Sequence, residues 1–282
     1  MGFRDAMVAI RTRRALPALD DLDALSLPLA SGPPVEISFV VPAHNEQALL
    51  PRTLAGIKTE AARVGCAAEI IVVDNASTDA TAAVAAAVPG VRVVAEPQKG
   101  LSRARQAGFA ASTGRLVANI DADTILPEGW LTQVLTEFGR DPKLVALSGP
   151  YIYYDAPMRI RIFARLFYCN GWLTYAVNRF VLRVGSMLQG GNFVVTRAAL
   201  EQIGGFDPAF TFYGEDTDAA RRLHRVGGVK FTFALPAFST GRRLAGDGLF
   251  ATGIRYSVNY VWATFMHRPY SQTSRDYRDQ KV

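Results

Sequence analysis

The feature that most constrains the fold is a largely apolar run that ends in two aspartates, within residues 115–130. Residues 116–120 have the length and composition of a strand that is buried on both faces. Asp121 and Asp123 follow directly, and Pro127 predicts the first position of a helix, because its fixed φ suits that place. Carboxylates at the carboxyl end of a buried strand, just ahead of a helix, lie where open α/β sheets bind their ligands.

Two interpretations of this Asp-x-Asp triplet are open at this point. Carboxylate oxygens are hard ligands of the type that Mg²⁺ or Mn²⁺ prefers, and such ions commonly bridge one or two carboxylates to substrate phosphates. An acidic turn would explain the same three residues without any ligand. The choice between a metal site and a turn therefore depends on the rest of the chain.

Composition narrows the class of protein. A chain of 282 residues, 49% of them apolar and 20% charged, has ample material for one large core. The net charge of +6 suits anionic partners such as nucleotides, phosphorylated lipids or a membrane surface. It would also suit nucleic acid, but no recognition motif for nucleic acid accompanies it, so we expect no such partner. Cys66 and Cys169 lack metal-ligand spacing, which indicates reduced, structural cysteines.

Charge and turn residues suggest how the chain is organised. Residues 1–34 carry scattered charges and end in Ser-Gly-Pro-Pro, which predicts a leader or docking segment and not a signal peptide. No stretch approaches the ~20 apolar residues that span a bilayer. We therefore expect a cytoplasmic protein, with peripheral contact at the inner face of the membrane as a further expectation. A main domain over residues 35–235 would be followed by a basic loop and an amphipathic helix over residues 236–282.

Alternating patterns predict the fold class. Four apolar runs, each ending in polar residues, alternate with segments of helical periodicity: residues 35–41, 69–73, 91–95 and 116–120. Strands that alternate with helices over short connections predict a doubly wound, mostly parallel α/β sheet with helices on both faces. A further strand is expected at residues 229–233. Apolar residues at helical spacing over residues 249–265 predict the C-terminal amphipathic helix.

Two segments of the second half have both a structural and a functional interpretation. Glu215, Asp216 and Asp218 are expected in the first turn of a helix, where the helix dipole favours anions. Asp218 also lies four residues before Arg222, so an ion pair on the helix could account for Asp218. Such helix chemistry accounts less well for all three acids at once. Residues 190–196 run from two glycines into a strand, and glycine permits a close approach of backbone to a ligand.

Residues 158–189 combine five arginines and six aromatic side chains with no acidic residue. They would form either a solvated basic face over an aromatic core or an amphipathic surface that faces a phosphorylated or membrane-borne acceptor. Residues 239–248 form a basic loop, which would be either a surface turn or a clamp on donor phosphates. The residues alone leave both pairs of alternatives open.

Five motifs occur together in a fixed order. They are Val40-Val-Pro-Ala-His-Asn-Glu46, Val72-Val-Asp-Asn-Ala-Ser-Thr-Asp79, Gly100-Leu-Ser-Arg-Ala-Arg-Gln-Ala-Gly108, Asp121-Ala-Asp123 and Gly214-Glu-Asp216. Their order and spacing resemble those of family 2 glycosyltransferases with the GT-A fold, in the nucleotide-diphospho-sugar transferase superfamily. The match covers about residues 35–235, most of the chain. By this resemblance, residues 35–125 are the nucleotide-binding half and residues 126–235 the acceptor and catalytic half.

The resemblance implies a function. It implies inverting transfer from a UDP-, GDP- or dTDP-sugar to a hydroxyl or phosphate of a glycan or lipid-linked acceptor, of hexosyltransferase type, in glycan biosynthesis. It also implies a divalent metal cofactor, Mn²⁺ or Mg²⁺. Asp123 matches the metal ligand, with Asp121 beside it at the ribose or sugar and as a second candidate ligand. Asp216 matches the catalytic base.

The remaining site residues follow from the same resemblance. The donor would be bound by residues that line the nucleotide, contact its base or pass its diphosphate: Pro42, Ala43, Glu46, Asp74, Gly100, Arg105 and Ala122, with Asp121 and Asp123. We expect five further residues either to contact the acceptor or to support the donor-binding residues from behind: Gly191, Asn192, Glu215, Arg242 and Arg243. Two positions depart from the family pattern. His44 stands where an aromatic residue is usual and Asn75 where Asp or Gly is frequent, and both affect the expected choice of donor.

The chemistry of sugar transfer fits these residue types. A departing nucleoside diphosphate develops negative charge, which a metal on Asp123 would stabilise, supplemented by the guanidinium of Arg105 or those of Arg242 and Arg243. The attacking hydroxyl must lose a proton, which requires a carboxylate such as Asp216. The alternatives are a nucleotidyltransferase, which would not need Asp216, and a nucleotide-sugar-binding protein without turnover. A dehydrogenase is disfavoured because no Gly-x-Gly-x-x-Gly follows the first strand.

Overall fold

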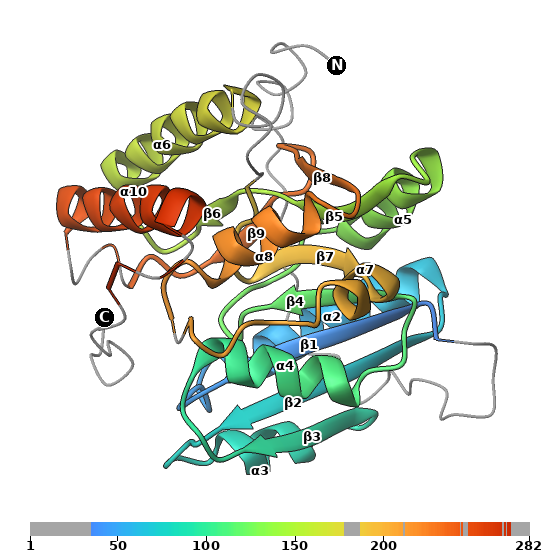
Figure 1. Cartoon of the computed structure of the whole chain (residues 1–282). Coiled ribbons are helices and arrows are strands. Elements are labelled where there is room, and N and C mark those ends of the chain that lie inside the picture. Colours follow the sequence, from blue (N-terminus) through green and yellow to red (C-terminus); the bar gives the residue numbers. More distant parts are fainter. Residues whose placement is uncertain are drawn as a thin grey trace.

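The computed structural model describes residues 35–177, 187–210, 212–242, 244, 248–266, 268, 270 and 271. Within these residues the chain forms a mixed seven-stranded sheet between layers of helices (Figure 1). The predicted α/β class, with a mostly parallel sheet and a C-terminal helix, is confirmed. The expected leader over residues 1–34 lies outside the described residues.

The first half of the chain follows the predicted alternation of strands and helices. It contains β1 (Ile37–Ala43), α2 (Leu50–Val64), β2 (Ala68–Asn75), α3 (Thr81–Ala86), β3 (Val91–Glu96), α4 (Leu101–Ala111) and β4 (Leu116–Ile120). Local sequence explains the ends of α2. The helix has a proline in its first turn and stops at Gly65, whose φ of 66° is the left-handed conformation that favours glycine at a helix end.

The second half is less regular. It contains α5 (Trp130–Arg140), β5 (Leu144–Ser148), β6 (Tyr151–Tyr153), α6 (Met158–Ala176), β7 (Asn192–Thr196), α7 (Arg197–Gln202), α8 (Glu215–Leu223), β8 (Gly228–Phe231), β9 (Ala237–Ser239) and α10 (Leu249–Met266). The expectation of a helix start at Pro127 is wrong. Gly129 adopts a φ of 80°, which breaks the helical path, so residues 127–129 form a turn and the helix begins at Trp130.

The order of strands explains how both halves build one edge of the sheet. The order is β3-β2-β1-β4-β7-β5-β8, and β7 runs antiparallel to both of its neighbours. Ile120, at the end of β4, therefore pairs with Asn192, at the start of β7. The glycines just before β7 thus come to the edge where the aspartates after β4 lie.

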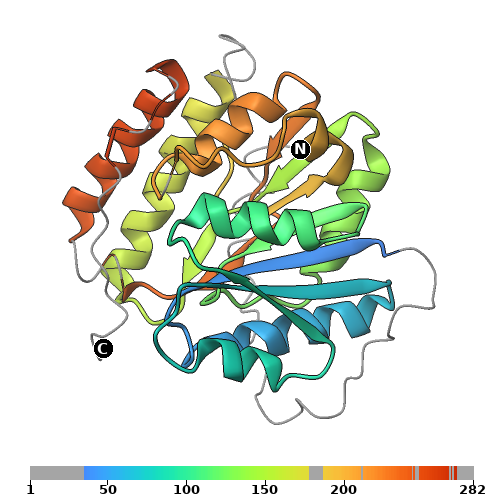
Figure 2. The ribbon, with the colours of Figure 1, turned by 60° about the horizontal axis from the view of Figure 1, so that its bottom comes forward.

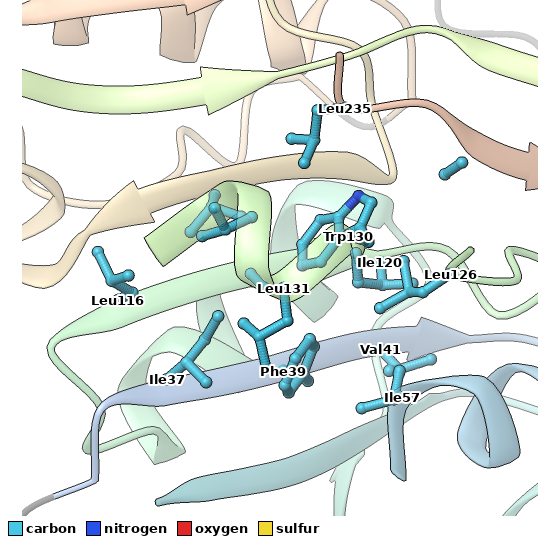
Figure 3. Close-up of a cluster of buried hydrophobic side chains, with 14 of the residues drawn as sticks. Ile37, Phe39, Val41, Ile57, Leu116, Ile120, Leu126, Trp130, Leu131 and Leu235 are labelled. Atoms are coloured by element: carbon cyan, nitrogen blue, oxygen red, sulfur yellow. The ribbon is translucent and has the colours of Figure 1, made fainter. Parts of the chain in front are cut away.

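Two apolar layers cover the sheet, as a doubly wound fold requires. One contains side chains of α2, α5 and α6, and Figure 3 shows Ile57 of α2 and Trp130 and Leu131 of α5 beside Phe39 of β1. The other contains side chains of α4, α7 and α8. Trp130 and Phe39 are both fully buried, with ring centroids 6.3 Å apart.

Three short strands were not predicted from the sequence, and the two longest described helices lie next to each other. β5 was not predicted, and β6 and β9 form a small parallel ladder that places Ser239 in a strand and not in the expected loop. α6 and α10 lie side by side at one end of the sheet in both views (Figures 1 and 2). In the described part of the chain, no helix is long and apolar enough to cross a bilayer.

Candidate functional site

A large pocket lies beyond the carboxyl ends of β1, β2 and β4. Its volume is about 1030 Å³, at the upper end of the ~300–1,000 Å³ that is usual for ligand pockets. Pro42 and Ala43 come from the end of β1, and Asn75 from the end of β2. Inner faces of α6 and α10 complete the lining. Parallel strands place their ends together, which is why sequence analysis could predict this edge.

The glycines before β7 bring backbone against the aspartates after β4. Gly191 adopts a φ of 76°, and a Cβ atom there would clash with the carboxyl group of Asp121. The carbonyl of Gly191 accepts a hydrogen bond of 3.3 Å from the amide of Asp121. The predicted close approach of the glycine backbone is therefore made to the aspartate of the chain itself.

A buried arginine joins the two predicted carboxylate motifs. Arg105, on α4, is fully buried and donates to Oε1 of Glu215 at 2.7 Å and to Oδ1 of Asp121 at 3.3 Å. Its guanidinium lies 5.2 Å from the ring centroid of Phe193. Burial alone would lower the pKa of Arg105, but Glu215, Asp121 and Asp216 outweigh it and raise the pKa. One cation thus serves three acids.

Glu215 and Asp216 compete for this single cation. Burial, followed by the negative charge of Asp216, raises the pKa of Glu215 to about 8, against the opposing effect of Arg105. Burial also raises the pKa of Asp216, while Arg105 and the amides of Gly190 and Thr217 oppose the rise. The amide of Gly190 donates to Oδ2 of Asp216 at 3.0 Å. Burial and the charge of Asp216 thus favour the protonated form of Glu215, while Arg105 and the two amides favour the ionised form of Asp216 against its burial.

Asp123 contacts a second arginine. Arg242 donates to Oδ2 of Asp123 at 3.0 Å and to Oε1 of the buried Glu46 at 2.6 Å. Thr240 donates to the same oxygen of Asp123 at 2.8 Å. The loop after β9 is therefore tied to both acids. Arg243 lies outside the described residues.

The carboxylate oxygens of Asp121 and Asp123 are ligands of the type that a divalent cation prefers. Among the described residues, no group of three or more His, Cys, Asp or Glu side chains is gathered as a full metal shell. Mg²⁺-type sites do not need one, because one or two carboxylates and substrate phosphates suffice. Asp123 already accepts the guanidinium of Arg242 as a cation, and Asp121 lines the same pocket. Asp121 and Asp123 thus line one pocket, and an oxygen of Asp123 already contacts a cationic group there.

One end of the pocket is formed by Asn75 and its neighbours. The side-chain amide of Asn75 donates to the carbonyls of Glu96 and Gln98, and its Oδ1 accepts from the amide of Gly100 at 2.8 Å. Asn75 therefore shapes the loop that opens α4. His44 accompanies it in the lining, and Nδ1 of His44 lies 2.7 Å from the carbonyl of Asn75.

Asp74 leaves a carboxylate oxygen without a partner. In the described part of the chain, its Oδ1 is buried and makes no hydrogen bond. Asp74 pairs in register with Ala43, which lines the pocket. A buried oxygen left unpaired is costly, and a base N–H of a bound nucleotide would satisfy it.

Two predicted or candidate residues support the fold and do not line the pocket. The side chain of Asn192 is fully buried and donates to the carbonyls of Gly149 and Leu235, while its Oδ1 accepts from Trp130. Asp218 is buried and paired with Arg221 and Arg222 on its own helix, both at 2.7 Å. The ion-pair interpretation of Asp218 is therefore confirmed.

Tyr151 also lies in the site, although it was not predicted from the sequence. Its hydroxyl lies 3.2 Å from Oδ2 of Asp121 and donates to the carbonyl of Gly190 at 2.8 Å. Burial, followed by the charges of Asp121 and Asp123, raises the pKa of Tyr151 well above its usual value, so it stays a neutral donor. No motif marks this tyrosine. It reaches the site only because the short strand β6 pairs with β9.

Comparison with known sequences shows which family the chain resembles. The family model described as glycosyl transferase family 2 matches residues 38–204, and one described as the N-terminal domain of galactosyltransferase matches residues 178–243. An uncharacterised glycosyltransferase of Mycobacterium tuberculosis is 39% identical over 109 residues, which are 39% of this chain and 46% of that protein. An undecaprenyl-phosphate 4-deoxy-4-formamido-L-arabinose transferase of Sodalis glossinidius is 34% identical over 116 residues, 39% of this chain and 36% of the relative. The matched stretches thus span less than half of each relative.

Solved structures show the same fold. Glucosyl-3-phosphoglycerate synthase from Mycobacterium tuberculosis, in complex with Mn²⁺ and UDP-glucose, aligns with a TM-score of 0.57 at 21% identity over 84% of this chain and 81% of that one. A mannosyltransferase from Pyrobaculum calidifontis, in complex with GDP-mannose and Mn²⁺, aligns with a TM-score of 0.56 at 20% identity over 84% and 63%. The glycosyl transferase family 2 model covers more than half of the chain. The chain therefore belongs to glycosyl transferase family 2, a family of sugar-transferring enzymes, and has the α/β fold of its GT-A members.

Proposed function

We propose that this protein is an inverting, metal-assisted glycosyltransferase that uses a nucleotide-diphosphate sugar as donor and Asp216 as general base. The observation that carries the proposal is the position of Asp216. Its carboxylate lines the same pocket as Asp121 and Asp123 and is held there by the amide of Gly190. Donor carboxylates and a separate base thus face one space, which is large enough for two substrates.

On the donor side, Asp123 and Asp121 would hold the divalent ion together with the diphosphate. When bound, the ion supplies positive charge at the oxygens on which the leaving group develops its negative charge. Arg242 touches Asp123 and would lie beside that diphosphate. Arg105 keeps Asp121 in place from behind, because its buried guanidinium contacts the carboxylate that faces the pocket. A preorganised charge of this kind costs no rearrangement during reaction.

On the acceptor side, Asp216 would take the proton of the attacking hydroxyl. A general base is most effective when its pKa approaches the working pH, and burial raises the pKa of Asp216 in that direction. Glu215 shares the same arginine, and burial and the charge of Asp216 raise the pKa of Glu215 to about 8. With one base and no carboxylate nucleophile, the anomeric configuration inverts.

The substrates are inferred from the pocket and from relatives. Solved structures with this fold carry UDP-glucose or GDP-mannose with Mn²⁺, which supports a nucleotide-sugar donor. The sequence relative from Sodalis glossinidius is named as an undecaprenyl-phosphate sugar transferase. Aromatic side chains of α6 and α10 line the acceptor side of the pocket here: Phe163, Phe167, Tyr256 and Tyr260. We therefore propose an acceptor with a lipid part.

The test compares Asp216→Asn with Asp207→Asn. Asp207 is an exposed aspartate outside the pocket and serves as the matched control. Loss of a general base lowers the rate by ~10²–10⁴-fold, so Asp216→Asn should lose transfer while donor and Mn²⁺ still raise its melting temperature. Full transfer activity in a folded Asp216→Asn variant would refute the assignment.

A second measurement separates this function from its alternatives. Release of a nucleoside diphosphate with the glycoside supports sugar transfer, whereas release of pyrophosphate would identify a nucleotidyltransferase. Asp123→Asn should remove the Mn²⁺-dependent part of the thermal shift with the donor. If the shift is independent of metal and unchanged in Asp123→Asn, the proposed metal site is wrong.

A further inference from the structure

We propose that α6 and α10 together form a docking face for an anionic lipid bilayer, onto which the acceptor side of the pocket opens. The inference rests on the proposed function, because it states where the lipid part of the acceptor comes from. It is carried by the exposed side chains of the two helices, their charge, and the lining of the pocket.

The outer side of α6 carries a row of exposed apolar side chains. Met158, Ile162, Leu166, Leu173 and Val177 lie at or just beyond this helix and are between 40% and 64% exposed. Steps of four and seven residues keep these positions on one side of a helix. The opposite side contains Ile160, Ala164, Tyr168 and Tyr175, which are buried. The helix is therefore apolar on the side that faces solvent as well as on the side that packs.

The neighbouring helix α10 continues this apolar surface. Ile254, Val261, Phe265 and Met266 are between 49% and 64% exposed. Figures 1 and 2 show α10 beside α6, and a Cβ atom on Gly253 would lie 3.7 Å from the ring of Phe163. Large exposed apolar patches on soluble proteins mark surfaces that bind a partner or a membrane.

The charge of the two helices identifies the partner. α6 and α10 contain four arginines and no acidic residue. Arg159 and Arg165 are exposed on α6, beside the apolar row. Helices that lie in the plane of a membrane interface combine an apolar side with Lys or Arg, which attract anionic lipids. A protein partner with an apolar interface would not require this one-sided charge.

The pocket connects this face to the catalytic carboxylates. Tyr256 and Val261 are exposed, at 39% and 50%, and both also line the pocket. Phe163 and Phe167 line it from α6, and Asp216 lies in the same pocket. An acceptor with a polar head and an apolar tail could therefore place its head at Asp216 while its tail stays at the surface. The nucleotide end, at Asn75 and Gly100, belongs to other elements of the pocket lining.

The experiment is co-flotation of the full chain with vesicles, one set of phosphatidylcholine alone and one containing phosphatidylglycerol. The wild type should bind the anionic vesicles, and raised salt should weaken the binding. Leu166→Glu with Phe265→Glu should reduce binding at least about tenfold, because two charges would enter the apolar face. The matched control, Ala110→Glu with Thr132→Glu, makes the same charge change at exposed positions of α4 and α5 and should bind like the wild type.

Three results would overturn the inference. The first is that the wild type does not float with anionic vesicles. The second is that both double variants lose binding equally. The third is that light scattering shows a dimer that only the variant Leu166→Glu with Phe265→Glu dissociates, which would identify a second copy of the chain as the occupant of this face. The thermal shift with donor and Mn²⁺ is measured on the same samples. A retained shift without flotation refutes the docking face alone, whereas flotation without any shift refutes the proposed donor site alone.

Discussion

Replacing Glu215 by glutamine should remove a pH dependence of folding stability that the wild type shows between about pH 5 and 8. Glu215 is 7% exposed, and its pKa is raised from 4.5 to about 8 by burial and by Asp216. Between these two values the folded chain keeps the proton that the unfolded chain has already lost. Stability from this group is therefore full below pH 4.5 and falls as the pH rises toward 8.

The magnitude follows from the two pKa values. Each pH unit in this interval costs about 1.4 kcal/mol of unfolding free energy, so the change from 4.5 to about 8 has a ceiling of roughly 5 kcal/mol. The ceiling is not reached in full, because Asp216 titrates in the same cluster and shares the change. A difference of about 2 to 4 kcal/mol between wild type and variant across the interval is expected.

The assay is urea unfolding of both proteins at half-unit steps from pH 5 to 8.5. Glutamine keeps the size of the side chain and stays neutral, so the slope of the wild type should be absent in Glu215→Gln. Glu201→Gln replaces an exposed glutamate on α7 and is the matched control. If Arg105 instead holds Glu215 ionised, the difference between wild type and variant would stay constant from pH 5 to 8 and change only at lower pH. That result would refute our account of the cluster.

Three further predictions concern single contacts. Gly191→Ala should cost about 1–3 kcal/mol more than Gly129→Ala in thermal unfolding, because both glycines have positive φ but only Gly191 lacks room for a Cβ atom; equal costs would contradict this. Asn192→Leu should cost about 2–5 kcal/mol in urea unfolding, because two buried carbonyls and an indole N–H lose their partner; a loss under about 0.5 kcal/mol would contradict it. Arg242→Met should tighten Mn²⁺ binding to the donor-free protein, measured by calorimetry, because the guanidinium no longer occupies Asp123; unchanged affinity would show that Arg242 does not compete with the ion.

Much of the fold was predictable because the relevant interactions are local or repeat along the chain. The strands of the first half have apolar runs of strand length, and parallel strands must end at one edge, so Asp121 and Asp123 could be placed without coordinates. Glu215 and Asp216 were predicted at a helix start, which the structure shows. Membership of family 2 rested on several such motifs taken in order.

The short elements were not predictable for the opposite reason. β6 and β9 have three residues each, and they exist as strands only because they pair with one another across more than 80 residues of sequence. Tyr151, which contacts Asp121, and Arg242, which contacts Asp123, depend on this ladder for their positions. No local pattern encodes such a pairing, because it depends on contacts between segments that are distant in the sequence.

The sequence by itself determined the family, the α/β class and the strand-end carboxylates, since each follows from periodicity or from a short motif. Only the tertiary structure decided which acids share a cation. Arg105, predicted beside the donor diphosphate, lines the pocket and is fully buried between Glu215 and Asp121. Asn192 was expected either to contact the acceptor or to support the site from behind, and its side chain donates to the carbonyls of Gly149 and Leu235. Burial and the partners of a charged or polar side chain depend on distant segments, and these set the pKa values on which the proposed chemistry rests.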